Sequence, residues 1–371
     1  MPSIKLVNVT KRFNGITAID RLSLEIEDQE YVCVLGPTGS GKTTLLRLIA
    51  GVIKPDSGEI YIDGELVNDV PPQERNVAYV PQRYALFTHL KVIENVAFGP
   101  VSRGVRRTEA LKLSMKFLEM MRLAWRADSY PDELSGGMQQ RLALARGLAS
   151  GAKILLLDEP LGALDARLRV ELRYKLRELV KSQGLTAIHV THDQEEALVV
   201  ADKIVVLRHG RVQQVGDPFS VYNEPRNIFV ANFVGGANFL EGFVANTAGG
   251  KSKIQLRGNL SLEVEGEYPV GERVVVAVRE EATGITGETE LVRTEETNLI
   301  PGIVDSVSFL GSFVLYEVTL LNGDKVSSKV PVQADHRKFM RGDKVLIQID
   351  PRQTRVYKYP PAGLYKELEA I

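Results

Sequence analysis

The stretch "GPTGSGKTT" at residues 36–44 decides the fold of the N-terminal part of this chain. It follows the apolar run "YVCVL" (31–35) and precedes the helical pattern "LLRLIAG" (45–51). A strand, a glycine-rich turn with the spacing G-x-x-x-x-G-K-[ST] and a helix, in this order, predict a phosphate-binding loop. The glycines let backbone N–H groups surround a phosphate. Lys42 would reach the β- and γ-phosphates, and the Thr43 hydroxyl would ligate Mg²⁺.

A second motif, "KILLLDEP" at residues 153–160, is a buried-strand pattern that ends in two carboxylates. Asp158 is placed to hold Mg²⁺, directly or through water, and Glu159 to polarise an attacking water. Alone, the pair is also compatible with two solvated acids at a strand end. With a phosphate loop upstream, the two acids indicate the catalytic side of a nucleotide site.

Four apolar runs alternate with helix-like segments, which predicts an α/β domain with a largely parallel sheet. The runs are "YVCVLG" (31–36), "NVAYVPQ" (76–82), "ILLLDE" (154–159) and "TAIHVTHD" (186–193). Ligands of such sheets bind at the carboxyl ends of the strands, so the four ends are candidates for one site. Gln82 could touch the metal or the attacking water, and His192 could hydrogen-bond the γ-phosphate. Taken singly, a glutamine in such a loop and a lone histidine are more often structural than functional.

The stretch "LSGGMQQR" at residues 134–141 resembles a second phosphate cradle. Ser135, Gly136 and Gly137 form a turn that opens a helix pattern, and a helix N-terminus leaves N–H groups free to hold an anion. This cradle lacks a lysine and a metal-binding hydroxyl. Because the chain's own nucleotide already has the loop at 36–44, we expect this turn to face a nucleotide bound by a second copy.

The composition excludes several classes of protein. The 371 residues carry 46 Lys and Arg against 47 Asp and Glu, a net charge of -1 that gives no electrostatic sign of nucleic-acid binding. The one cysteine, Cys33, excludes an internal disulfide. No run of 18 uncharged apolar residues is present, so we expect a soluble protein that acts at a membrane only through a partner.

The composition changes near residue 236, after which strand and turn patterns replace helical ones. Two segments resemble each other, "GERVVVAVREE" (271–281) and "GDKVLIQIDPR" (342–352), which indicates a duplicated β-barrel unit or a chance match of two amphipathic strands. The predicted domains are 1–235, with a helical subdomain at about 85–150, and 236–371.

These motifs together resemble the ATP-binding-cassette (ABC) ATPases over residues 3–235. The resemblance rests on the phosphate loop, the Gln after a strand, "LSGG", the strand ending in "DE", "ALDA" at 163–166 and the later His. "THDQEEAL" and the β extension are similar to ATPase subunits of bacterial and archaeal solute importers. "GDKVLIQIDPRQTRVY" (342–357) is similar to their oligonucleotide-fold-like regulatory domain. The implied fold is an α/β P-loop ATPase domain with a helical subdomain, followed by an all-β, OB-like barrel domain.

The resemblance implies a role for each matching residue. Glu159 is the catalytic base, His192 the switch histidine, and Gln82 the γ-phosphate sensor, which also serves the metal. Asp158 and Thr43 hold Mg²⁺, and Asp165 lies in a loop that crosses between subunits. Residues that bind ATP are Phe13, Gly36, Pro37, Thr38, Gly39, Ser40, Gly41, Lys42, Thr43, Thr44, Ser135, Gly136, Gly137 and Asp165. Phe13 would stack on adenine, although it could also pack under the first hairpin.

The sequence departs from the family pattern at three places. Met138 follows "LSGG" where Gln is usual, Phe13 stands where Tyr or Trp is common, and "REE" (279–281) replaces a more usual Arg-Pro-Glu. Phe keeps an aromatic face for stacking. Met138 could alter how its helix packs, and "REE" leaves a contact of that strand end open.

The implied function is ATP hydrolysis by a homodimer on the cytoplasmic face of the cell membrane. Its partners are integral membrane permease subunits and, indirectly, a solute-binding protein, with no nucleic acid. The segment 83–99, "RYALFTHLKVIENVAFG", is a candidate docking surface or an ordinary core-facing loop and helix. The alternatives are a soluble ABC ATPase that acts on nucleic acid or ribosomes, and a regulator without enzymatic activity. The "GGANFLEG" junction (235–242) favours an inorganic ion or polyamine over a sugar as the solute.

Overall fold

The four apolar runs become neighbouring strands of one six-stranded sheet in the computed structural model, which describes residues 3–287, 297–332 and 339–369. The strand order is β10-β9-β3-β8-β7-β6, and every pair is parallel except β10 with β9. The strands are β3 (Tyr31–Leu35), β6 (Val77–Val80), β7 (Ile154–Asp158), β8 (Thr186–Thr191), β9 (Lys203–Arg208) and β10 (Arg211–Gly216). Because β3, β7 and β8 are buried along their whole length, they read as continuous apolar runs rather than alternating ones.

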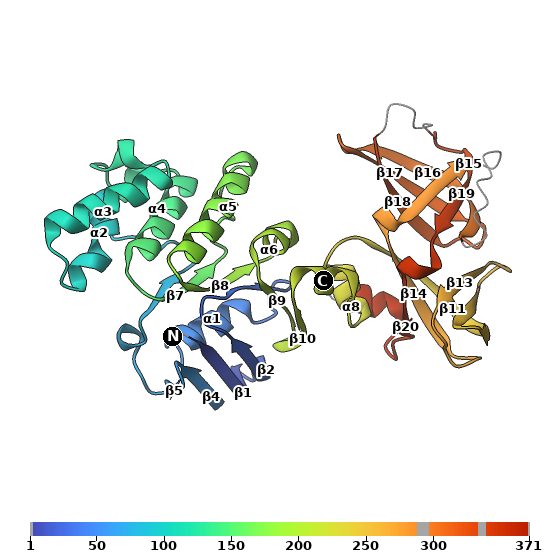
Figure 1. The fold of residues 1–371 in the computed structure, drawn as a ribbon, viewed down its shortest axis with the longest axis horizontal. Helices are drawn as coiled ribbons and strands as arrows, with labels where there is room; N and C mark the ends of the chain where they lie inside the picture. The colour runs from blue at the N-terminus through green and yellow to red at the C-terminus, as the bar shows by residue number, and fades with distance from the viewer. Residues whose placement is uncertain (1–2, 288–296, 333–338, 370–371) are drawn as a thin grey trace. The chain divides into compact units, whose positions relative to one another are not determined.

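A second, antiparallel sheet has the order β2-β1-β4-β5. Its strands are β1 (Ile4–Phe13), β2 (Ile16–Ile26), β4 (Ser57–Ile62) and β5 (Glu65–Leu66). Helix α1 (Lys42–Ala50) lies between the two sheets, and its apolar residues share one core with both (Figure 1). This packing fixes the start of α1, and therefore the phosphate loop, at the carboxyl end of β3.

The remaining helices of this part pack on the other side of the six-stranded sheet or form a separate group (Figure 1). The group consists of α2 (Val92–Ser102), α3 (Arg107–Met120) and α4 (Gly136–Ala149), which contact one another. Further elements are α5 (Ala166–Ser182), α6 (Gln194–Val200), α7 (Pro218–Asn223) and the 3₁₀ turns η1 (Pro72–Glu74), η2 (Ala124–Arg126) and η3 (Pro131–Glu133). Helix α4 therefore begins at the "LSGG" turn.

The chain separates into two compact units, Met1–Asn223 and Glu224–Ile371. Helix α8 (Ile228–Phe233) belongs to the second unit because Ile228 packs with Val275 and with Leu364 of α9 (Leu364–Glu369). The boundary at 235/236 follows the change in composition, whereas packing places the division 12 residues earlier. The domain limits from the sequence, and the helical subdomain, stay predictions.

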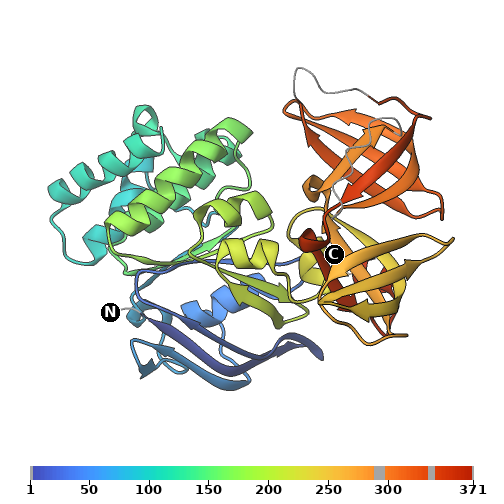
Figure 2. The same ribbon diagram turned by 45° about the vertical axis from the view of Figure 1, so that its right-hand side comes forward.

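The second unit is all-β apart from its short helices and contains two five-stranded antiparallel sheets (Figure 2). One has the order β13-β12-β11-β14-β20 and the other β15-β19-β16-β17-β18. The first comprises β11 (Ala237–Ala248), β12 (Lys251–Leu256), β13 (Ser261–Glu265), β14 (Arg273–Arg279) and β20 (Thr354–Lys358). The second comprises β15 (Thr283–Gly287), β16 (Asn298–Phe309), β17 (Phe313–Leu320), β18 (Lys325–Pro331) and β19 (Lys344–Ile349). Each sheet curls until its edge strands meet, β13 with β20 and β15 with β18.

The two sheets are copies of one arrangement, and they exchange a strand. Strand β14 runs through η4 (Glu280–Ala282) into β15, which pairs with β19 of the other sheet. Strand β19 runs through η5 (Pro351–Gln353) into β20, which pairs with β14. The two similar sequence segments thus occupy equivalent places, so the match reflects a duplicated barrel unit rather than chance.

Two asparagines at equivalent positions tie each copy to the other. Asn238 of β11 bonds both the N–H and the carbonyl of Ser327 on β18, at 2.7 and 2.8 Å. Asn298 of β16 bonds the same two groups of Glu263 on β13, at 2.6 and 2.8 Å. An amide side chain can satisfy one peptide group completely, so each asparagine replaces a backbone pairing partner across the sheets.

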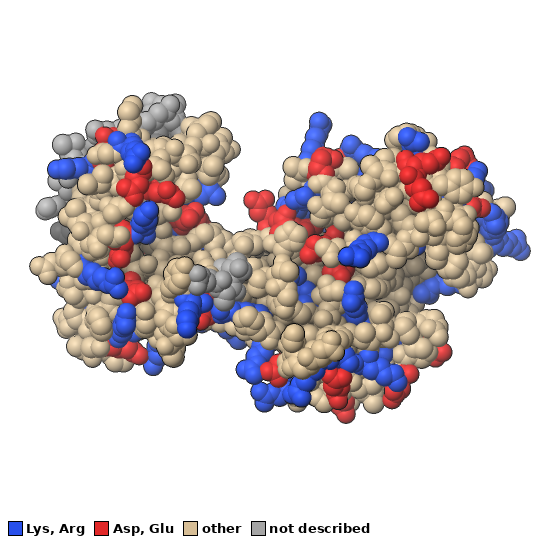
Figure 3. Space-filling view, turned by 180° about the vertical axis from the view of Figure 1, so that it is seen from behind, with Lys and Arg blue, Asp and Glu red and all other residues tan. Residues whose placement is uncertain are grey.

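No helix of the described residues is long and apolar enough to cross a membrane. On the face drawn in Figure 3, basic and acidic side chains are interspersed over both units. That distribution agrees with the net charge of -1 for the whole chain.

Candidate functional site

The phosphate loop lies between the end of β3 and the start of α1, where the sequence predicted it. Gly41 is the residue before the helix, and the first N–H groups of a helix have no intrahelical partners, which creates an anion site. Lys42 is buried, and its Nζ donates to the carbonyls of Gly36 (2.7 Å) and Pro37 (2.9 Å). Burial lowers the pKa of Lys42, while the nearby Glu159 and Asp158 raise it. The amine is thus held over the loop it belongs to.

Two glycines are required by close backbone contacts. A Cβ on Gly36 would lie 2.3 Å from the Leu207 carbonyl oxygen, and one on Gly41, whose φ is 105°, would lie 2.4 Å from that of Ala18. Only glycine fits such positions. The buried Ser40 hydroxyl has no hydrogen-bond partner within the described residues, so the loop retains a polar group for a ligand.

A hydroxyl and a carboxylate form the corner next to this loop. Thr43 Oγ1 donates to Asp158 Oδ1 at 3.1 Å, and Tyr79 Oη donates to Asp158 Oδ2 at 3.2 Å. Burial raises the pKa of Asp158, and these two hydrogen bonds oppose the rise. Mg²⁺ prefers oxygen ligands and is commonly bound through one or two carboxylates together with substrate phosphates, so this donor set fits it. Tyr79 was not among the residues predicted from the sequence.

Glu159 lies between two of the other predicted residues. Its Oε2 accepts from Gln82 Nε2 at 2.9 Å, and its Oε1 is 3.4 Å from His192 Nδ1. The Glu159 backbone is left-handed, with φ 50°, and its N–H donates to the Val190 carbonyl at 2.9 Å. A non-glycine residue in this conformation is strained, and such strain is concentrated at functional sites. Gln82 therefore lies with Glu159, and its amide nitrogen points at that carboxylate rather than at the Thr43–Asp158 corner.

The "LSGG" turn opens α4 as predicted. Ser135 is the residue before the helix, its hydroxyl makes no capping bond, and Gly136 is exposed. Within the described part of the chain, the turn forms no hydrogen bond or ion pair with the phosphate loop. The first helix N–H groups are thus open to a ligand from outside the chain.

Gln140 connects α4 to the loop after β7, and its role was not predicted. Its Nε2 donates to the Glu159 carbonyl and its Oε1 accepts from the Ala163 N–H, both at 2.8 Å. The residue is buried, so these two contacts satisfy both of its polar groups. The position of a glutamine one turn after "LSGG" is the only sequence signal that could have pointed to such a contact.

Phe13 and Asp165, the two remaining predicted residues, form no hydrogen bond or ion pair with this cluster among the residues that the structure describes. The Phe13 ring is 43% exposed at the end of β1, and Lys11 Nζ lies over it, 5.5 Å from its centroid. Asp165 precedes α5, and its side chain accepts from the Leu168 N–H at 2.9 Å. Asp165 therefore caps a helix in the single chain.

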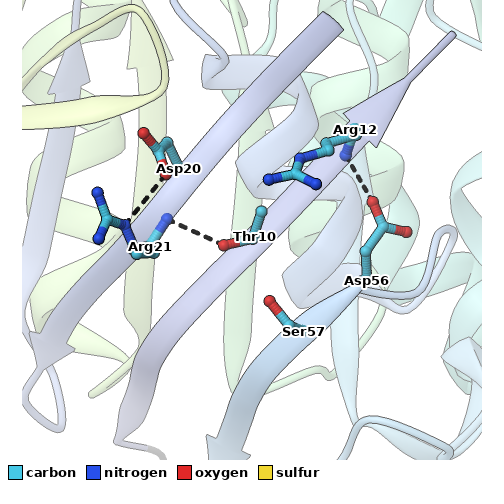
Figure 4. Close-up of a pocket in the computed structure, with 6 residues that line it drawn as sticks. All are labelled: Thr10, Arg12, Asp20, Arg21, Asp56 and Ser57. Atoms are coloured by element: carbon cyan, nitrogen blue, oxygen red, sulfur yellow. Dashed lines mark hydrogen bonds and ion pairs between the residues drawn. The ribbon is translucent and has the colours of Figure 1, made fainter. Parts of the chain in front are cut away.

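A pocket of about 600 Å³ lies elsewhere, on the antiparallel sheet among β1, β2 and β4 (Figure 4). It is lined by Thr10, Arg12, Asp20, Arg21, Asp56 and Ser57. Hydrogen bonds from Arg211 and Lys11 hold the pKa of Asp20 and of Asp56, respectively, below the usual range. None of the predicted site residues lines this pocket.

Comparison with known proteins defines the class. Residues 19–162 match the ABC transporter family, and residues 272–356 match the TOBE domain. A solved dimer of a bacterial ABC transporter cassette covers 58% of this chain and 98% of its own, with 35% identity and a TM-score of 0.55. A related dimer, in a post-hydrolysis state bound to ADP and phosphate, aligns with 34% identity over the same shares and the same TM-score.

Full-length relatives narrow the class further. The spermidine/putrescine import ATP-binding protein PotA of Rubrobacter xylanophilus is 42% identical over 94% of this chain and 92% of its own length. The Fe(3+) ions import ATP-binding protein FbpC of Fusobacterium nucleatum is 40% identical over 100% of this chain and 96% of its own. The chain belongs to the ABC family, as an ATPase of the import ATP-binding subunit type. The predictions of fold, family and ATPase activity are thereby confirmed.

Proposed function

We propose that two copies of this chain hydrolyse ATP together, each nucleotide lying between the phosphate loop of one copy and the "LSGG" turn of the other. One observation carries the proposal. The turn offers an exposed helix start and an uncapped Ser135 hydroxyl, yet it has no lysine and, among the described residues, no bond to its own phosphate loop. Half a site is useful only when a second chain supplies the rest.

Each residue of the cluster has a part in this proposal. Lys42 would leave its two carbonyl partners for the β- and γ-phosphates, and Thr43 with Asp158 would hold Mg²⁺, which would neutralise charge on the phosphate oxygens. Gln82 and His192 keep the Glu159 carboxylate and the γ-phosphate in position relative to each other. Glu159 accepts a proton from the attacking water as that water adds to the γ-phosphorus, while the bond from this phosphorus to the β–γ bridging oxygen breaks and ADP leaves. Phe13 stacks on the adenine ring, and Asp165 lies at the contact between copies.

ATP binding closes the two copies and hydrolysis opens them, because the γ-phosphate contacts are lost. Membrane permease subunits on the cytoplasmic face convert this motion into import, with residues 83–99 as the docking surface. A solute-binding protein delivers the solute to the permease. Relatives named for polyamines and for Fe(3+) favour a cationic solute, and we propose spermidine or putrescine.

The shared site is tested with Ser135→Ala. We expect its ATP hydrolysis to fall about tenfold because one hydrogen bond to a charged group is lost in the closed dimer. Binding of ATP to the isolated monomer is unchanged, since the phosphate loop is intact. Ser102→Ala, an exposed serine of α2 that bonds only its own helix, is the matched control. Weaker ATP binding by the Ser135→Ala monomer would contradict sharing.

The solute is tested by deleting the gene in its host and measuring uptake of labelled spermidine, putrescine and Fe³⁺. We expect polyamine uptake to be lost, and to return with the wild-type gene but not with Glu159→Gln. If only iron uptake were lost, the proposed solute would be a metal ion and not a polyamine.

A further inference from the structure

The loop after Gln82 contains two successive left-handed residues, Tyr84 with φ 57° and Ala85 with φ 46°. Neither is glycine, and L-residues adopt this conformation singly and at a cost. Two in succession persist only when the surroundings hold them. Within the loop, the Tyr84 N–H donates to the Pro81 carbonyl at 3.1 Å and the Ala85 N–H to the Arg83 carbonyl at 2.5 Å, and a contact from outside the loop adds to these two bonds.

Arg146 of α4 is the side chain that holds the pair. Its Nη1 donates to the Ala85 carbonyl at 2.8 Å and its Nη2 to the Tyr84 carbonyl at 3.0 Å. The guanidinium also lies over the Phe87 ring, 5.0 Å from the centroid. The planar fork of arginine suits two adjacent carbonyls in a way that an ammonium cannot. Among the described residues Arg146 has no carboxylate partner, so its charge is committed to this loop.

The next part of the loop has a separate support. Buried Asn95 of α2 accepts from the Phe87 N–H and donates to the carbonyls of Phe87, Leu90 and Lys91. Arg146 therefore controls only the residues next to Gln82. Loss of its contacts would release the loop on the side of the catalytic cluster and leave the far side in place.

Helix α4 thus contacts both of the segments that carry the partners of the Gln82–Glu159 hydrogen bond. Through Gln140 it holds the carbonyl of Glu159, and through Arg146 it holds the loop that carries Gln82. The Gln82–Glu159 hydrogen bond joins these two segments to each other. The helix begins at the "LSGG" turn, so a displacement at that turn is transmitted to both partners of the bond.

We propose that Arg146 is a positioning residue that keeps Tyr84 and Ala85 left-handed and thereby aligns Gln82 with Glu159. This inference rests on the proposed function, because Gln82 and Glu159 matter only if they act on ATP. Among the described residues, the Arg146 guanidinium donates hydrogen bonds to the Tyr84 and Ala85 carbonyls only, so it acts on Gln82 through the loop. Its role is to make the alignment depend on the position of α4.

The first test is Arg146→Lys in the full chain, with ATP hydrolysis and hydrogen exchange measured together. We expect kcat to fall about tenfold with KM for ATP within about twofold, because alignment is lost while binding is not. Amide protection of residues 84 and 85 should fall, and that of 87–95 should not. Arg75→Lys is the matched control, since buried Arg75 donates to carbonyls at the end of α1 and in the 67–70 loop. It should lower the melting temperature without changing kcat or exchange at residues 84 and 85.

The second test is rescue by Ala85→Gly in the Arg146→Lys protein. Glycine adopts positive φ without a steric cost, so kcat should return to within about twofold of wild type. Failure of the rescue, or an Arg146→Lys protein that differs from wild type only in melting temperature, overturns the proposal. If Arg146→Lys does not fold, Ala85→Val gives the answer: a β-branched residue disfavours the left-handed region, and an unchanged kcat rejects the inference. If the wild type fails to hydrolyse ATP, the proposed function fails, while the exchange measurement still decides whether Arg146 holds the loop.

Discussion

The amide nitrogen of Gln82 lies 2.9 Å from a carboxylate oxygen of Glu159, although 77 residues separate the two in the chain. They meet because β6 and β7 are adjacent parallel strands, and each residue follows the carboxyl end of its strand. On the other side of the carboxylate, His192 Nδ1 is 3.4 Å away at the end of β8. One acid is therefore oriented by two side chains from neighbouring strands.

Replacing Glu159 by Gln should separate ATP binding from hydrolysis. The variant keeps the phosphate loop, but it has no group to accept the water proton, so hydrolysis falls about 10²–10⁴-fold. With ATP and Mg²⁺ present, size-exclusion chromatography should show a dimer that does not dissociate. A variant that binds nucleotide and yet elutes as a monomer would contradict the shared site.

Lys42→Ala should weaken nucleotide binding itself. The amine and its bonds to the phosphates are removed, and hydrogen bonds to charged groups are worth about 1.5–3 kcal/mol, which is about 10- to 100-fold in Kd. Calorimetric titration with ATP measures the change. Lys54→Ala, at an exposed lysine paired with Asp69, serves as the control and should bind as wild type does. Equal ATP affinities of Lys42→Ala and Lys54→Ala would show that Lys42 does not bind the nucleotide.

His189 should make the first unit less stable in mild acid. The side chain is fully buried on β8, with Nδ1 3.0 Å from Tyr31 Oη and Nε2 3.5 Å from Glu196 Oε1. Burial lowers the pKa of His189, so below about pH 6.5 the unfolded chain takes up a proton that the folded chain refuses. The contribution of the neutral, buried His189 to the free energy of unfolding is therefore fully present above that pH. It falls towards the lowered native pKa by up to about 1.4 kcal/mol per pH unit.

Urea unfolding at pH 7.5, 6.5 and 5.5, followed by the fluorescence of Trp125, measures this dependence, because the single tryptophan lies in the first unit. His189→Gln should flatten the slope below pH 6.5. His209→Asn is the control, since this exposed histidine is left-handed and asparagine tolerates that conformation. A slope that persists in His189→Gln would assign the effect to another group.

The asparagine pair of the second unit predicts two unequal losses of stability. Asn238→Ala leaves the half-buried N–H and carbonyl of Ser327 without this partner, which costs about 1–3 kcal/mol, whereas Glu263 is exposed, so water can satisfy its two groups in Asn298→Ala and the loss should be smaller. Differential scanning calorimetry should show the transition of the second unit shifted down in both variants. Asn246→Ala, at an exposed asparagine that bonds only the next residue, should leave it in place. An Asn238→Ala protein whose transition is not shifted would mean that the hydrogen bonds between Asn238 and Ser327 are not needed to join the sheets.

The sequence predicted the parts of the fold and site that are local or periodic. The phosphate loop needs glycines at fixed spacing, and strands buried on both faces read as unbroken apolar runs whose polar ends must share one edge of the sheet. Gln82, Asp158, Glu159 and His192 could therefore be assigned to one place from the strand pattern alone. The similarity of 271–281 and 342–352 indicated the duplication in the same way.

The contacts of Gln140, Tyr79 and Arg146 could not be predicted from the sequence. Each contact depends on where another segment places a carbonyl or a carboxylate, and no rule of residue spacing gives the position of that segment. The exchange of β15 and β20 is of the same kind, because each strand pairs in the sheet to which its predecessor in the chain does not belong. The short η4 and η5 turns lie at the two crossings, after β14 and β19.

The exchanged strand sets an order for synthesis of the chain. The first barrel lacks its fifth strand until residues 354–358 have been translated, although β11 to β14 are complete by residue 279. During that interval the open edge of β14 exposes unpaired backbone groups, which are a template for wrong pairing. A ribosome-bound chain must therefore keep a half-built barrel soluble while the second is being made, and neither barrel can be removed as a separate module.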